Sequence, residues 1–205
     1  MITFQTMQPG EIKDCVNIAA EAFGSYDFFR AYVTDDNKRP RYLRSMMITE
    51  YRVNRDKMTF FTAKENGKII ATAIVRAPGY VMPTTGEYIK AGFWRNILIA
   101  GLKNVAAWFE MDQDAGLPCS ELKEAYFLHL LAVDRSMEGK GIGSRMLKEC
   151  IIPYAKEKGA GTLCLYTNSG INCRFYEKNG FRQFENREYS YGGVSFGSWS
   201  YQMDF

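Results

Sequence analysis

The sequence of 205 residues contains only one histidine, His129, and five cysteines. The cysteines lie far apart, and no two of them form a C-x-x-C pair. With a single histidine beside them, they do not supply the usual ligand set of a structural zinc site. Their odd number also argues against a disulfide framework and favours free thiols in a reducing compartment. We therefore expect no metal ion and a cytoplasmic location. The cysteines are Cys15, Cys119, Cys150, Cys164 and Cys173.

Long apolar runs and runs of one charge are missing as well. No segment has the roughly eighteen uninterrupted apolar residues of a membrane span. Residues 1–10 lack the charged and then apolar segments of an export signal. The net charge of +3 is small, and no basic run is interleaved with aromatic residues. We therefore expect neither a membrane nor a nucleic acid as partner. A hydrophobic content of 46% at this length fits one globular domain, 1–205.

The most informative stretch is an apolar run, 126–133, that is followed by closely spaced glycines. The run has the composition of a buried strand. Gly139, Gly141 and Gly143 come just before a helical pattern that continues to residue 158. Glycine lets the backbone come close to a ligand, and N–H groups at a helix start lie at the positive end of the helix dipole. The loop is therefore a candidate site for phosphate oxygens.

The glycine spacing narrows the choice of phosphate ligand. A P-loop requires a lysine directly after its last glycine and before serine or threonine, whereas Lys140 lies between two glycines. The dinucleotide fingerprint G-x-G-x-x-G fits only in part, because Met146 occupies the third glycine position. A Rossmann-type nucleotide-binding enzyme is therefore a weaker alternative, and an ordinary strand-to-helix turn without a ligand is another.

Two segments resemble motifs of the GNAT superfamily of acyl-CoA-dependent acyltransferases. Residues 138–143 (EGKGIG) resemble motif A, Q/R-x-x-G-x-G/A, at both glycines. They depart at Glu138, because a carboxylate cannot donate a hydrogen bond to a phosphate. Binding would then rest on backbone amides, with Lys140 as a possible addition. Residues 172–181 (NCRFYEKNGF) resemble motif B, N-x-x-F-Y-E-K-x-G-F, and are the more distinctive of the two.

The resemblance is good over roughly the last eighty residues and extends to the first half only in the order of its elements. It implies an α/β (α+β) fold of three layers, with a central mixed, mostly antiparallel sheet and helices on both faces. It also implies an N-acetyltransferase that transfers an acetyl group from acetyl-CoA to a primary amine by direct attack in a ternary complex. A non-catalytic acyl-CoA-binding sensor is the alternative. The segment at about 78–120 exceeds the minimal core of this superfamily, so we expect a helical insertion there.

In the resembled superfamily the central strand splays from its neighbour, and unpaired backbone groups hold the pantetheine arm. Here that strand is 126–133, and its neighbour after a crossover helix would be 162–167. Val133 is, by position, our choice for the backbone donor nearest the phosphates. The residues that the resemblance assigns to acyl-CoA are Leu131, Ala132, Val133, Glu138, Gly139, Lys140, Gly141, Ile142, Gly143, Ser144, Asn172 and Tyr176.

The same strand carries the candidate general base. Strand alternation predicts that His129 shares a face with Leu131 and Val133. A neutral imidazole is suited to accept the proton that an amine must lose before it attacks a thioester, directly or through water. A histidine hydrogen-bonded within the sheet is the structural alternative. Glu121 and Glu124 are the other candidate bases.

Motif B carries the candidate general acid. Asn172 and Tyr176 lie one helical turn apart on one face. The resemblance implies that the Tyr176 hydroxyl protonates the leaving thiolate and that Asn172 binds the pantetheine or pyrophosphate region. The alternative for Tyr176 is a packed aromatic ring whose hydroxyl reaches a backbone group. A covalent route through Cys173 is a rival mechanism, but no second histidine is available to activate that thiol.

The acceptor side is less defined. Tyr26, Phe28, Phe29 and Tyr32 could line an acceptor pocket, although aromatic residues at this spacing more often form plain core. Between residues 89 and 109, apolar side chains fall on one broad face of an amphipathic helix or helix pair. That segment could cover the sheet, close over a small-molecule amine, or meet a second subunit in a homodimer. The sequence does not identify the amine.

Overall fold

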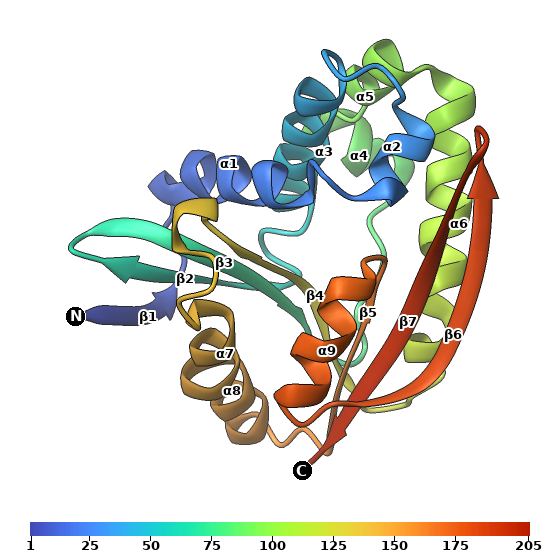
Figure 1. The fold of residues 1–205 in the computed structure, drawn as a ribbon. Coiled ribbons are helices and arrows are strands. Elements are labelled where there is room, and N and C mark those ends of the chain that lie inside the picture. Colours follow the sequence, from blue (N-terminus) through green and yellow to red (C-terminus); the bar gives the residue numbers. More distant parts are fainter.

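One sheet of seven strands runs through the computed structural model, which describes residues 1–205 (Figure 1). Every neighbouring pair is antiparallel except β4 and β5, so the sheet is mixed and mostly antiparallel, as the resemblance implied. A Rossmann-type enzyme requires a mostly parallel sheet, so this topology excludes that alternative. In spatial order the strands are β1 (Ile2–Thr6), β2 (Thr59–Glu65), β3 (Lys68–Arg76), β4 (Tyr126–Val133), β5 (Thr162–Thr167), β7 (Val194–Asp204) and β6 (Arg182–Tyr191).

Helices cover both faces of the sheet (Figure 1) and enclose two large hydrophobic cores, one on each face. On one face the core contains side chains of α1, α2, α3 and α6, and on the other it contains side chains of α7, its π-helical continuation and α9. None of the helices combines the length and the apolar composition that a membrane crossing requires. The helices are α1 (Ile12–Phe23), α2 (Asp27–Tyr32), α3 (Arg39–Val53), α4 (Thr85–Ala91), α5 (Trp94–Ala100), α6 (Leu102–Ser120), α7 (Ile142–Met146), α8 (Ile152–Glu157) and α9 (Gly170–Lys178).

Two tight hairpins connect neighbouring strands of the sheet. Asn66 and Gly67 have φ values of 51° and 81°, and two such left-handed residues are what a type I′ turn between β2 and β3 requires. Gly192 and Gly193, with φ values of 58° and 79°, join β6 to β7 in the same way. Local turn chemistry therefore sets both connections.

The segment 78–120 forms three helices between β3 and β4. The sequence predicts a helical insertion here, with one helix or a pair at 89–109. Thr84 and Glu87 form a capping box that starts α4, and Gly92, with a φ of 105°, ends it. The long helix α6 then packs against β5, β6 and β7 (Figure 1). Because α6 buries Trp108 in the larger core, the segment is part of that core as well as a cover for the sheet.

The helix behind the glycine loop is not one regular α-helix as far as residue 158. It proceeds from α7 through a π-helical turn, Leu147–Ile151, into α8. Pro153, which lacks an N–H group, lies in the first turn of α8, where helices tolerate proline. The Ile152 N–H reaches back five residues to the Leu147 carbonyl. The wider turn therefore lets the helix continue past the proline.

Candidate active site

The strands β4 and β5 are paired only at their beginning. Their parallel register joins Tyr126 to Leu163 and Phe127 to Cys164, and it ends there. From Leu128 onward, β4 has no strand partner on this side, although its pairing with β3 continues to its end. A gap therefore opens between the carboxyl-terminal halves of the two strands, as the resemblance implied.

Two residues of β4 direct their backbone groups into this gap. The Asp134 N–H donates to the Ile70 carbonyl of β3 at 2.8 Å. Because backbone groups alternate in direction along a strand, Leu131 and Val133 point their N–H and C=O groups away from β3 and into the gap. Ala132 points its groups toward β3. Of the three residues expected here, Ala132 is therefore wrong as a source of free backbone groups.

The glycine loop between β4 and α7 presents a row of free amides. Gly139 and Gly141 both have a φ of 74°, a left-handed conformation that side chains disfavour. The first helical hydrogen bond after the loop is from Arg145 N–H to the Gly141 carbonyl. The amides without a hydrogen-bond partner in the chain are those of Gly139, Gly141, Ile142, Gly143 and Ser144. Neighbouring free N–H groups at a helix start form an anion site.

The loop is held against α9 by two contacts. A Cβ atom at Gly143 would lie 3.2 Å from Cζ of Phe175, which is tighter than ordinary packing, and 3.7 Å from Cγ2 of Val133, so a side chain there would press on the Phe175 ring. The Ser144 hydroxyl accepts a hydrogen bond from the Asn179 side chain at 3.1 Å. Motif A and motif B thus pack on each other beside the gap.

Glu138 and Lys140 lie at the outer edge of the loop, and both are exposed. The Lys140 Nζ is 3.5 Å from the sulfur of Met137 and forms no ion pair, so its charge is free to meet an anion. The Glu138 carboxylate is itself negative and cannot bind an anion in this way. The departure from motif A therefore leaves the candidate anion site with backbone donors and one lysine.

Asn172 faces the gap but uses its amide within the protein. Its Nδ2 donates to the Tyr26 hydroxyl at 2.8 Å and to Oγ1 of Thr167, the last residue of β5, at 3.0 Å. Only its Oδ1 remains for a ligand. Tyr26, from the turn before α2, was missed as a partner of Asn172 because no sequence pattern joins residues so far apart.

The Tyr176 side chain is 7% exposed, and its ring packs against Phe181 and Tyr201. Its hydroxyl forms no hydrogen bond with the protein, and the residue lines the cavity next to the gap. Burial raises the pKa of Tyr176, so the hydroxyl keeps its proton at neutral pH. The alternative of a structural tyrosine bonded to a backbone group does not apply.

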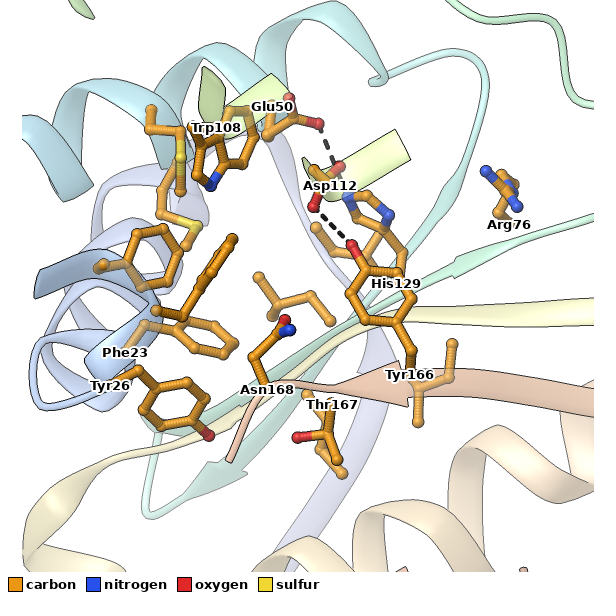
Figure 2. Close-up of a pocket in the computed structure, with 18 of the residues that line it drawn as sticks. Phe23, Tyr26, Glu50, Arg76, Trp108, Asp112, His129, Tyr166, Thr167 and Asn168 are labelled. Carbon is orange, nitrogen blue, oxygen red and sulfur yellow. Dashed lines mark hydrogen bonds and ion pairs between the residues drawn. The ribbon is translucent and has the colours of Figure 1, made fainter. Parts of the chain in front are cut away.

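A cavity of about 180 Å³ continues from the gap between the strands (Figure 2). Leu131, Asn172 and Tyr176 line it at the gap, and aromatic and methionine side chains form most of its remaining wall. Most of these side chains come from α1, α2, α3 and α6, so the cavity lies under the helical cover. The apolar wall includes Phe23, Phe28, Phe29, Met46, Met47, Met58, Trp108 and Phe109.

His129 lines the cavity, but not on the predicted face. Ile74 pairs with Leu130 and Val75 with Leu128, which leaves His129 as an extra residue in a β-bulge. The bulge reverses the alternation, so Leu131 packs on the core of α7 while His129 points to the opposite face, toward α3. The prediction that His129 shares a face with Leu131 and Val133 is therefore wrong, although His129 does reach the cavity.

Two carboxylates that the sequence analysis missed stand near His129 (Figure 2). Glu50 of α3 places Oε2 3.6 Å from His129 Nε2, and Asp112 of α6 accepts a hydrogen bond from the Tyr166 hydroxyl at 2.5 Å. Desolvation raises the pKa of Asp112. One sequence feature could have indicated these two residues: each is a carboxylate on the apolar face of a helix. Glu50 follows Met46 by one turn in α3, and Asp112 follows Trp108 by one turn in α6.

The family model for the GNAT acetyltransferase family matches residues 25–181. The chain belongs to the GNAT family. As a GNAT protein it is an acyltransferase, and its free loop amides and splayed strands are the features that the two sequence motifs implied. A search of curated proteins by sequence gives no match.

Solved GNAT structures share the fold of this protein at low sequence identity. A histone acetyltransferase HPA2 and related acetyltransferase from Corynebacterium glutamicum is 16% identical, with 97% of this chain and 94% of that chain covered and a TM-score of 0.67. A mutant agmatine N-acetyltransferase in its apo form is 12% identical over 100% and 99% of the two chains, with a TM-score of 0.65. The PaiA N-acetyltransferase from Thermoplasma acidophilum, in complex with coenzyme A, is 14% identical over 100% and 99%, with a TM-score of 0.58.

Three residues considered as alternatives lie outside the cavity of this GNAT protein. Glu121 and Glu124 are exposed near the end of α6 and in the turn before β4, and neither lines the cavity. Cys173 does not line it either and packs on the core of the opposite face. The structure therefore brings His129 and Tyr176 to one cavity and leaves these other candidates away from it.

Proposed function

We propose that this protein transfers an acetyl group from acetyl-CoA to a primary amine by direct attack in a ternary complex. One observation carries the proposal: the free loop amides, the backbone groups of Leu131 and Val133, and the cavity that holds His129 and Tyr176 adjoin one another. A phosphate-bearing thioester could therefore bind in the gap while an amine occupies the cavity.

The binding half of the proposal rests on donors that the protein itself leaves unpaired. Loop amides at a helix start suit phosphate oxygens, with Lys140 beside them. Leu131 and Val133 offer the exposed edge of a strand, which suits the amide groups of a pantetheine arm. When bound, acetyl-CoA supplies an activated acyl carbon and a thiolate leaving group.

The chemical half assigns one proton transfer to each of two side chains. His129 accepts a proton from the amine, and the Glu50 carboxylate at 3.6 Å stabilises the imidazolium that results. As the N–C bond forms and the C–S bond breaks, the Tyr176 hydroxyl gives its proton to the departing sulfur. The N–H groups directed into the gap stabilise negative charge that develops on the carbonyl oxygen. A covalent route would need Cys173 in the cavity, and this residue points elsewhere.

Calorimetry separates this proposal from its alternatives. We expect acetyl-CoA and CoA to bind and NAD not to bind, and we expect thiol release from acetyl-CoA to depend on an added amine. Failure to bind CoA would refute the proposal. Binding of acetyl-CoA without turnover of any amine in a broad panel would favour the non-catalytic sensor. Because all five cysteines are free, we also propose a reducing, cytoplasmic location.

A further inference from the structure

The cavity offers three kinds of contact that together describe an acceptor. We propose that the acceptor is a small primary amine with an apolar, ring-sized body and a hydrogen-bond-accepting oxygen a few bonds from the nitrogen. This inference rests on the proposed acetyl transfer and names its substrate class. Its three parts rest on the size and wall of the cavity, on the charges in one corner, and on an unpaired donor.

The apolar wall and the volume of the cavity fit a ligand whose apolar part is about the size of one aromatic ring. The cavity measures about 180 Å³, and 18 of the 26 residues that line it are hydrophobic. Cavities of roughly 150 Å³ with apolar walls hold a benzene-sized molecule. Met46, Met47, Phe23 and Phe28 all line the cavity, and thioethers and ring edges are favourable neighbours for an aromatic ring. A charged, extended polyamine would gain little from this wall.

The charges in one corner call for a cation. Glu50 and Asp112 both face the cavity near His129, and neither has a lysine or arginine within ion-pair distance. Arg76 is the one basic side chain besides His129 in the lining, and its guanidinium lies over the rings of Phe127 and Tyr80, at 4.5 Å and 5.1 Å. Two partly desolvated carboxylates without such a partner attract an ammonium group. They also place the amine beside the base that must deprotonate it.

The unpaired donor calls for an oxygen. Trp108 is 6% exposed, and its Nε1 is buried without a hydrogen-bond partner. Figure 2 shows this nitrogen directed into the cavity. Buried donors in native proteins are nearly always paired, so an acceptor on a ligand would complete this one. Trp108 lies one turn before Asp112 on α6, where side chains are about 5–6 Å apart at Cβ. One helix would therefore hold both the oxygen and the nitrogen of the ligand.

Three ligands of nearly equal size test each part. In 2-phenoxyethylamine all features are present; 3-phenylpropylamine has a methylene in place of the oxygen, and 3-phenylpropan-1-ol also has a hydroxyl in place of the amine. By calorimetry on the full chain with CoA present, we expect the ether amine to bind about two- to tenfold more tightly than 3-phenylpropylamine, as one hydrogen bond allows. We expect the alcohol to bind at least about tenfold more weakly than the amines.

Two variants assign the preferences to residues. Trp108→Phe keeps a ring but loses the N–H group, so we expect it to abolish the preference for the ether while keeping the preference for an amine over an alcohol. Asp112→Asn should reduce the amine preference and keep the ether preference. Thermal denaturation of both variants establishes that they are folded. If Trp108→Phe keeps the ether preference, or if the alcohol binds as well as the amines, the inference is wrong.

Other ligands separate the failure of this inference from that of the proposed function. Tighter binding of agmatine, or of a short peptide with a free amino terminus, would overturn the assigned substrate class while leaving acetyl transfer intact. The same holds if CoA binds and none of the aromatic amines does. If CoA itself does not bind, the proposed function fails first. Release of thiol with 2-phenoxyethylamine, together with its N-acetyl product, would support both.

Discussion

Removal of the Tyr176 hydroxyl separates a catalytic role from a structural one. This hydroxyl has no hydrogen-bond partner in the protein, so Tyr176→Phe breaks no bond within the fold. We therefore expect its Tm to stay within about 2–4 °C of the wild type, the shift that about 1 kcal/mol produces in a chain of this size. If Tyr176 is the acid, thiol release should fall about 10²- to 10⁴-fold. CoA affinity should change little, because the ring remains.

A matched control in the same fold is Tyr51→Phe. The Tyr51 hydroxyl is bonded to Oγ1 of Thr72 at 2.7 Å in the core and does not line the cavity. Loss of this bond leaves a buried hydroxyl unpaired, which costs about 1–3 kcal/mol. We therefore expect Tyr51→Phe to lower Tm and to keep its turnover, the reverse of Tyr176→Phe. An unchanged turnover number in Tyr176→Phe would refute the assignment of the acid, and a large drop in its Tm would refute the structural argument.

Three further predictions concern the glycine loop, the proposed base His129 and the partly buried Asp112. Gly143→Ala should lower the free energy of unfolding measured in urea by about 1–3 kcal/mol, because a Cβ atom there overpacks against Phe175; unchanged stability would contradict the close approach. His129→Ala should lower kcat/KM about 10²- to 10⁴-fold and regain activity with added imidazole; wild-type activity would exclude His129 as the base. For Asp112, burial raises the folded-state pKa, so its charge costs stability as pH rises above the unfolded value of about 3.9. Asp112→Asn should therefore unfold at higher urea concentration than the wild type, with a difference that grows between pH 4 and pH 8.

Local patterns predicted most of the elements that build the candidate anion site. The glycines at 139, 141 and 143, the strand that ends at Val133 and the helix that carries Tyr176 all lie where the sequence places them. These features depend on backbone conformation over a few residues, which glycine spacing and apolar periodicity report directly. The free amides and the gap between β4 and β5 then follow from how a strand, a loop and a helix are joined.

The acceptor cavity could not be predicted in the same way, because its wall comes from distant segments. Glu50 and Asp112 belong to α3 and α6, and only the folded chain brings them to His129 on β4. Each is a single carboxylate in an otherwise apolar helix face. A single polar residue does not change the prediction that such a face packs in the core, so neither carboxylate was assigned a function from the sequence. The three helices of 78–120 match no motif, yet they supply Trp108 and Asp112, both central to the proposed acceptor.

The error about His129 shows how one residue can redirect a site. Without the bulge, simple alternation would put His129 on the face of Leu131, over α7 and away from Glu50. With one residue added between Leu128 and Leu130, the imidazole points to the cavity while Leu131 and Val133 still turn their backbone groups to the gap. In the proposed reaction, one short strand thus provides both the base and the backbone donors. A strand without the bulge could not do both. Its side chains would alternate with a period of two, so a strand that turns the backbone groups of Leu131 and Val133 to the gap would place His129 on the face of Leu131, away from the cavity.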